Sequence, residues 1–292
     1  MVVYSGHAIL LATLGGMLVG ASASVLLHIN HQIMGVSGMI KGSIKSMMDR
    51  KPFADWSVKP FFVLGLLTGG TIASFLYPSN LKIWGSSYPL WRVALGGLLA
   101  GGGTSLSNGC TSGHGICGLA RLSKRSLVAV TTFMTAGFLV ASVTSSSSFQ
   151  EYHNGYRSGD GIGWAPTFVI AAAILALGPA VRTLFSKQTE YAIGSAQFVS
   201  LLSGSAFAIA LSVAAMTDAS VVAGFLDLHL SRWNPALAFV MAGGLAVNLP
   251  MYQVLTRPTK VATGVCTVPT STTVDARLVG GAIMFGSGWG LA

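Results

Sequence analysis

Residues 93–120 read VALGGLLAGGGTSLSNGCTSGHGICGLA, a run without a single charged side chain. A helix that crosses a lipid bilayer needs about 20 predominantly apolar residues, so this run is long enough to do so. Its second part, residues 107–118, combines glycines with serine, threonine and asparagine, which form a poor membrane helix. Such backbone is tolerated at membrane depth only where it is buried in protein or lines a polar cavity. We therefore expect a spanning helix that leads into a broken or re-entrant, glycine-rich segment.

Similar runs occur along the whole chain. Together they make eight candidate crossings, at residues 6–28, 60–81, 93–120, 126–150, 161–181, 191–217, 233–256 and 278–292. The 292 residues include only 17 Lys and Arg and 8 Asp and Glu, whereas 52% are hydrophobic. A soluble domain of this size carries far more surface charge. The sequence therefore predicts an all-α integral membrane protein, a multi-span helical bundle in the cell membrane.

The basic residues fall unevenly on the two sides of these crossings. One side receives 13 of the 17, namely Lys41, Lys45, Arg50, Lys51, Lys59, Arg121, Lys124, Arg125, Arg182, Lys187, Arg257, Lys260 and Arg277. The other side holds Lys82, Arg92, Arg157 and Arg232, together with the N-terminus. Because Lys and Arg near span ends stay in the cytoplasm, the N-terminus is predicted to lie outside. The formal net charge of +9 is then a topology signal and does not indicate a nucleic-acid partner.

The two halves of the chain resemble each other. RVALGGLLAGGGTSL at 92–106 aligns with RLVGGAIMFGSGWGL at 277–291 at a shift of 185, which matches an arginine, glycines and a leucine. A second match places Trp56, Phe62 and Val63 opposite Trp233, Phe239 and Val240. If crossings one, two and three correspond to six, seven and eight, the odd separation inverts the second copy. Inverted internal repeats with glycine-interrupted segments are typical of secondary transporters, whose binding site lies near the midplane.

This repeat predicts the domain organisation. Residues 1–146 form a first membrane repeat, 147–163 a linker loop, and 164–292 an extra span followed by the second, inverted repeat. The last apolar run, after Arg277, has about 15 residues and is short for a span. The shift of 185 carries Cys110 to a position just beyond Ala292. We therefore expect the second repeat to be incomplete and the gene to continue with a glycine, a cysteine and a ninth span.

Cys110, His114 and Cys117 are the reactive residues of the broken segment. A zinc site could use C-x3-H-x2-C, but it would need a fourth ligand or a catalytic water, and the spacing fits no common structural pattern. Haem attachment requires C-x-x-C-H, which is absent here. Neutral thiols and backbone N–H groups could instead bind a sulfur-containing anion, because a thiol donates weakly without the cost of burying a charge. A buried cysteine can also act as a small hydrophobic residue, which we expect for Cys266.

Several stretches carry a resemblance to one family. GCTSGHGICGLARLSKRSLVA at 109–129 resembles the signature of the YeeE/YedE family, the sulphur-transport domain proteins of the membrane. MGVSGMIKG at 34–42 resembles the loop after that family's first span. Three stretches of the second half resemble the second subunit of the family's two-chain form: MTDASVVAGFLDL at 216–228, WNPALAFVM at 233–241 and DARLVGGAIMFGSGWGL at 275–291. The chain thus resembles both halves fused.

The resemblance implies a transporter, not an enzyme, that imports an inorganic sulfur anion, with thiosulfate as the expected substrate. On the matching positions, the substrate path would be formed by Asn108, Gly109, Cys110, Thr111, Ser112, Gly113, His114 and Cys117. No cofactor or metal is implied. The expected partners are the lipid bilayer and the anion, with a cytoplasmic sulfur-carrier protein as a candidate. The alternative, from another functional class, is a membrane sulfurtransferase or redox protein in which Cys110 becomes a persulfide nucleophile.

The chain also departs from the family pattern. The second half stops short of the family's G-x-CPGP element, and HINHQIMGVSG at 28–38 has no cysteine where some members carry one. Arg92 and Arg277 flank corresponding crossings, where they could steer an anion or anchor the helix ends. No nucleotide-binding motif is present, which argues against an ATP-driven pump within this chain.

Overall fold

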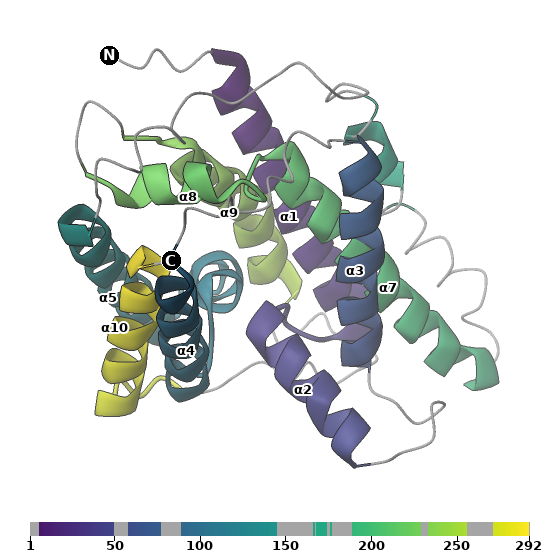
Figure 1. Ribbon diagram of the computed structural model, residues 1–292. Helices are drawn as coiled ribbons and strands as arrows, with labels where there is room; N and C mark the ends of the chain where they lie inside the picture. Colours follow the sequence, from purple (N-terminus) through teal and green to yellow (C-terminus); the bar gives the residue numbers. More distant parts are fainter. Residues whose placement is uncertain are drawn as a thin grey trace.

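The computed structural model describes residues 6–49, 58–76, 89–144, 166, 168–173, 176, 189–228, 233–255 and 271–291. Every regular element within these residues is a helix (Figure 1). The helices are α1 (Gly6–Asn30), α2 (Val36–Met48), α3 (Val58–Leu76), α4 (Leu90–Ser107), the π-helix η3 (Thr111–Gly118), α5 (Lys124–Thr144), α7 (Thr189–Val213), α8 (Ala219–Leu226), α9 (Ala236–Leu255) and α10 (Ala276–Leu291). The predicted all-α membrane bundle is confirmed.

Seven of the eight predicted crossings contain one of these helices. Five, namely α1, α3, α5, α7 and α9, are long and apolar enough to span a membrane. The helices α4 and α10 are shorter, with 18 and 16 residues. In the run 161–181, residues 168–173 are helical, and most of the others lie outside the described residues. The predicted linker 147–163 and Cys266 also lie outside them.

Four helical segments end at a residue with a left-handed backbone. His31 follows α1, Asn108 follows α4, Leu122 follows η3 and Ala215 follows α7, with φ values of 53°, 59°, 57° and 55°. A left-handed residue after a helix lets the next N–H groups bond to the last helical carbonyls. At Asn108 this turn stops the apolar run 93–120 in its middle, so the predicted break is confirmed.

The helices pack in pairs that join distant parts of the chain. α1 lies against α9 and α7, α3 against α7, and α10 against α4 and α5. Figure 1 shows α4, α5 and α10 together on one side and α1, α3, α7 and α9 on the other. The glycines set these contacts, since helices in lipid gain from close packing at small residues. A Cβ at Gly16 would overlap the Val240 carbonyl, and one at Gly65 would overlap the Leu201 carbonyl.

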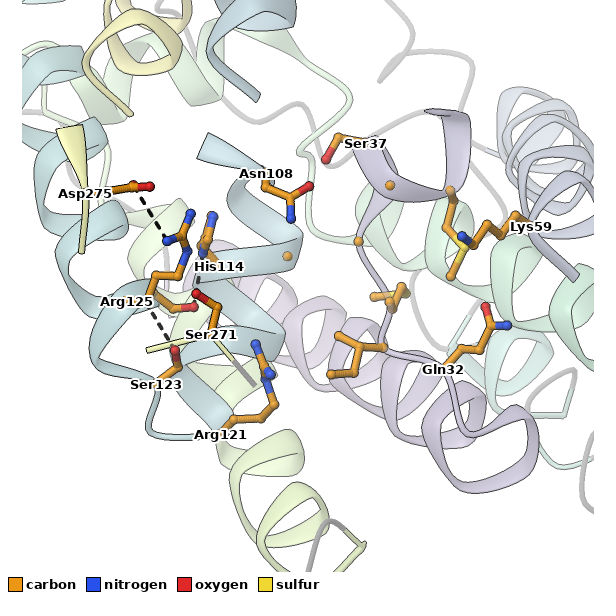
Figure 2. A pocket seen from close by; sticks show the side chains of 18 residues that line it. Gln32, Ser37, Lys59, Asn108, His114, Arg121, Ser123, Arg125, Ser271 and Asp275 are labelled. Atoms are coloured by element: carbon orange, nitrogen blue, oxygen red, sulfur yellow. Dashed lines mark hydrogen bonds and ion pairs between the residues drawn. The ribbon is translucent and has the colours of Figure 1, made fainter. Parts of the chain in front are cut away.

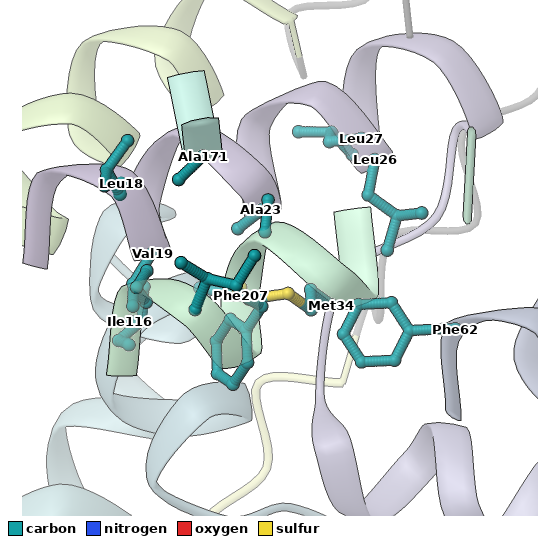
Figure 3. Close-up of a cluster of buried hydrophobic side chains, with 14 of the residues drawn as sticks. Leu18, Val19, Ala23, Leu26, Leu27, Met34, Phe62, Ile116, Ala171 and Phe207 are labelled. Atoms are coloured by element: carbon teal, nitrogen blue, oxygen red, sulfur yellow. The ribbon is translucent and has the colours of Figure 1, made fainter. Parts of the chain in front are cut away.

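The main apolar core holds the broken segment in place. Leu18, Val19, Ala23, Leu26 and Leu27 of α1 meet Phe62 of α3, Phe207 of α7 and Ile116 of η3 (Figure 3). The rings of Phe62 and Phe207 are tilted, with centroids 6.2 Å apart. Ile116 thus joins η3 to the main core, and η3 as a whole lies against α5, α9 and α2.

Candidate functional site

The break in the run 93–120 is built by Asn108 and its neighbours. Asn108 has φ 59° and ψ 40°, and its backbone N–H donates to the Thr104 carbonyl. The next N–H, that of Gly109, donates to the same carbonyl at 3.1 Å. Cys110 is extended and caps the start of η3. The chain thus leaves one helix and enters another within three residues, and Cys110 lies at the amino end of the second.

A second helix also begins beside Cys110. The first N–H of α2, that of Val36, donates to Ser112 Oγ at 3.1 Å. The same hydroxyl lies 3.2 Å from Cys110 Sγ, and Ser37 is also next to the thiol. A Cβ on Gly35 would stand 3.5 Å from the Gly113 Cα, so the two backbones approach closely here. The amino ends of α2 and η3 therefore converge on one partly buried cysteine.

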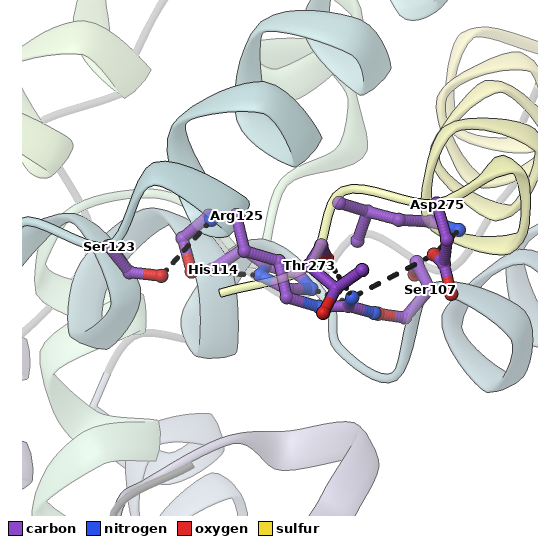
Figure 4. Close-up of polar contacts among 8 residues, drawn as sticks. Ser107, His114, Ser123, Arg125, Thr273 and Asp275 are labelled. Atoms are coloured by element: carbon purple, nitrogen blue, oxygen red, sulfur yellow. Dashed lines mark hydrogen bonds and ion pairs between the residues drawn. The ribbon is translucent and has the colours of Figure 1, made fainter. Parts of the chain in front are cut away.

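His114 joins the broken segment to α4 and α5. Its Nε2 lies 3.3 Å from the Ser107 carbonyl and its Nδ1 3.0 Å from Ser126 Oγ (Figure 4). A carbonyl only accepts hydrogen bonds, so Nε2 carries the proton and Nδ1 accepts from the Ser126 hydroxyl. The backbone at Gly109 passes against the ring, where a Cβ would overlap it. Both ring nitrogens are engaged within the protein, so the imidazole acts as a brace for the segment that carries Cys110.

Replacing His114 by alanine is expected to destabilise the fold. The change removes two hydrogen bonds at a side chain that is only 7% exposed and leaves the Ser126 hydroxyl without its acceptor. Unsatisfied buried groups cost about 1–3 kcal/mol each. The thermal unfolding midpoint of the detergent-solubilised protein should fall, whereas the matched change His28→Ala, at an exposed position of α1, should leave it unaltered. Equal midpoints for the two variants would contradict the brace.

Cys117 has different surroundings from Cys110. Its side chain is completely buried in the main core cluster, beside Tyr252 of α9 and the backbone of Met34. The two cysteines are free thiols. Of the predicted path residues, Asn108, Gly109, Gly113 and His114 line a common cavity, and Ser112 holds α2 at its edge. Thr111 is partly buried in the first turn of η3.

Arg92 and Arg277, which the sequence suggested could steer an anion, are not among the residues that line this cavity. The Arg92 guanidinium donates to the Thr144 carbonyl at 3.4 Å and so ties the start of α4 to the end of α5. Arg277 is exposed in the first turn of α10. Within the described residues, no three His, Cys, Asp or Glu side chains are placed to hold a metal ion.

The cavity beside the broken segment has a volume of about 700 Å³. It is bordered by the α1–α2 connection, the break at Asn108, the turn between η3 and α5, and the residues before α10 (Figure 2). Three cationic side chains line it: Lys59, Arg121 and Arg125. Sequence reasoning missed these three as site residues, because it used them only to orient the spans. Their clustering on one side of the predicted topology was the signal that could have found them.

Two family models match the chain, one in each half. Residues 3–140 match the sulphur transport family, and residues 196–292 match DUF6691, a family of unknown function. A probable transporter of Xylella fastidiosa strain 9a5c is 39% identical over 129 residues, which are 44% of this chain and 89% of the relative. A probable transporter of strain Temecula1 / ATCC 700964 is 36% identical over the same shares. A further probable transporter of strain 9a5c is 34% identical over 94 residues, 32% of this chain and 64% of the relative. No solved structure matches the chain.

Proposed function

Because the chain belongs to the sulphur transport family, we propose that it imports a small inorganic sulfur anion, thiosulfate, across the cell membrane. Within this proposal, the anion passes the break between α4 and η3. Cys110 contacts it with a neutral thiol, and backbone N–H groups at the two helix starts supply further donors. A cytoplasmic sulfur-carrier protein remains a candidate recipient of the imported ion.

The observation that carries the proposal is the meeting of two helix amino ends at Cys110. Val36 of α2 and Cys110 at the start of η3 are both bonded to Ser112 Oγ, at 3.1 and 3.2 Å. A helix amino end bears a partial positive charge and free N–H groups, so it favours an anion. Discontinuous membrane helices use such ends to hold anionic substrates in secondary transporters. A thiol at this point adds a weak donor with a soft sulfur atom and no charge of its own.

The helix contacts support the proposed inverted repeats, 1–146 and 164–292. Under the shift of 185, Gly96 corresponds to Gly281 and Gly103 to Gly288. Gly96 contacts Gly288, and Gly103 contacts Gly281. If each glycine is replaced by its counterpart in the other half, the first contact becomes the second. The helix pairs show the same symmetry. In the proposed repeat α3 corresponds to α9 and α7 corresponds to α1, and α3 packs on α7 just as α9 packs on α1. We propose that the path runs along the axis of this exchange, where α4 and α10 meet.

The proposed topology predicts which loops can be labelled from outside. Single cysteines placed within residues 147–160 should react with a membrane-impermeant thiol reagent applied to intact cells, and cysteines within 41–51 should react only after the membrane is opened. The reason is the 13 to 4 division of the basic residues, which keeps residues 41–51 in the cytoplasm. Labelling of both loops from the same face would rule out the inverted repeat.

Uptake into sealed vesicles tests the function itself. Proteoliposomes that contain the purified protein should accumulate radiolabelled thiosulfate, and unlabelled thiosulfate should compete better than sulfate. Thiosulfate should be recovered intact from the lumen, with its S–S bond unbroken. The alternative function, a membrane sulfurtransferase, predicts instead that the label is split between a Cys110 persulfide and released sulfite. Absence of uptake in vesicles with correctly inserted protein would overturn the transport proposal.

A further inference from the structure

The cavity next to the broken segment carries an excess of positive charge. It is lined by Lys59 of α3, Arg121 of the turn before α5 and Arg125 of α5, and Asp275 is the only acidic side chain among its described lining residues. Polar groups without charge, including Gln32, Ser123 and Ser271, complete the wall (Figure 2). Three cations and one carboxylate give the described lining residues a formal net charge of two positive charges, opposite in sign and equal in size to the charge of a dianion.

Asp275 is placed where it competes for one of these cations. Its Oδ1 lies 3.7 Å from Arg125 Nη1, and the same guanidinium nitrogen also donates to the Thr273 carbonyl (Figure 4). The Arg125 side chain is 17% exposed and that of Asp275 is 45% exposed, so the carboxylate can turn into solvent while the arginine stays. Asp275 Oδ1 also accepts from the Leu278 N–H at 2.9 Å, which caps the start of α10.

We propose that this cavity is a second anion-binding site, an inner vestibule that takes a small divalent oxyanion after it has passed Cys110. The site rests on the proposed transport function for its place in the path. Lys59, Arg121 and Arg125 attract the anion, and Asp275 acts as a built-in competitor for Arg125. The amino ends of α3, α5 and α10 all border the vestibule. It therefore lies on the side of the bundle where most of the basic residues are found.

Competition between the Asp275 carboxylate and the anion for Arg125 would help a transport path to release the anion that it binds. Conduction requires that binding is favourable enough for an ion to enter and weak enough for it to leave. A dry site with three cations would retain a dianion. With a volume of about 700 Å³, the cavity is far larger than an inorganic oxyanion, so the bound ion keeps part of its water. The carboxylate and the retained water both keep affinity low, as an exit site requires.

Charge variants of opposite sign test this site. The probes are thiosulfate and sulfate, measured by equilibrium binding to purified protein in detergent. Arg125→Gln should weaken binding by about tenfold or more, because it removes a charged donor, and hydrogen bonds between charged groups are stronger than those between neutral groups. Asp275→Asn should tighten binding by about two- to fivefold, as expected for removal of a partly exposed competing charge. The asparagine amide oxygen can still cap α10, so the fold is retained.

Matched controls separate the vestibule from general surface charge and from the thiol. Lys45→Gln removes an exposed cation of α2 that does not line the cavity, and it should leave binding unchanged. Repeating the series in a Cys110→Ala background isolates the vestibule from the site at the break. If Arg125→Gln fails to fold, Arg121→Gln and Asp275→Asn carry the test.

The outcomes distinguish this site from the transport proposal. Anion binding that follows the predicted signs, in a protein that moves no sulfur anion into vesicles, would overturn the proposed function and keep the vestibule as an anion site. Transport with binding that Asp275→Asn leaves unchanged or weakens, at matched thermal stability, would overturn the vestibule and leave the function standing. Absence of binding of either probe to the wild-type protein would also overturn it.

Discussion

Cys110→Ala is expected to reduce thiosulfate uptake by about one to two orders of magnitude while the protein stays folded and inserted. The thiol lies at the meeting point of the α2 and η3 amino ends, with Ser112 Oγ 3.2 Å away. Losing one hydrogen bond to a charged group costs about 1.5–3 kcal/mol, which corresponds to that change in rate or affinity. Alanine fits the space of the cysteine, so the packing of the break is retained.

The measurement is growth on thiosulfate as the sole sulfur source, in a host that lacks its own importers, together with initial uptake rates in vesicles. Cys110→Ser keeps a donor but loses the soft sulfur contact. Partial activity of this variant would mean that donation dominates, and loss of activity would mean that the sulfur atom does. Wild-type growth of Cys110→Ala, at equal membrane expression, would exclude this cysteine from the path.

The other two cysteines serve as comparisons. Cys117→Ala is expected to have an intermediate effect. Its side chain is fully buried in the core, so the change leaves a small void beside Tyr252 and weakens the support of η3. The lower uptake of Cys117→Ala should therefore be accompanied by a lower unfolding midpoint, which Cys110→Ala should not show. Cys266→Ala is expected to be nearly silent.

The spans and the break were predictable because both follow from local chemistry. Long uncharged runs have few alternatives to a membrane helix, and Asn108 followed by Gly109 ends the helix α4 by a rule that needs no tertiary information. The glycine contacts could be predicted in part, since the match of Gly96 with Gly281 and Gly103 with Gly288 indicated a repeat. Which glycine meets which could not be predicted, because that depends on how two distant helices cross.

The brace and the vestibule depend on residues that are far apart in the sequence. Ser107 and Ser126 are ordinary small polar residues until the fold brings both to the ring of His114. The sequence placed His114 on the substrate path but could not show that both of its ring nitrogens are hydrogen-bonded within the protein. Likewise, Lys59 lies at the start of α3 and Arg121 in the turn before α5, and the sequence does not indicate that Asp275 comes close to Arg125.

The crossing of α4 and α10 leads to the other large effect. Gly103 lies in the last turns of α4, and a Cβ there would overlap the backbone of Phe285 and Gly281. Because the obstacle is backbone, the two helices have to separate. Gly103→Ala is therefore expected to destabilise the protein by about 1–3 kcal/mol or more. Uptake should fall with it, since α4 leads directly into Cys110.

Gly101 provides the control for this change on the same helix. A Cβ at Gly101 meets nothing within 4 Å, so Gly101→Ala should be neutral or stabilising by up to about 1 kcal/mol, the helix propensity difference. The partner helix offers the same comparison: Gly281→Ala would meet the Ser107 N–H group, whereas Gly280→Ala meets open space. Thermal unfolding in detergent and vesicle uptake should rank Gly103→Ala and Gly281→Ala together below Gly101→Ala and Gly280→Ala. If all four variants behaved alike, the α4–α10 crossing could not be what holds the break in position, and the path axis would have to lie elsewhere in the bundle.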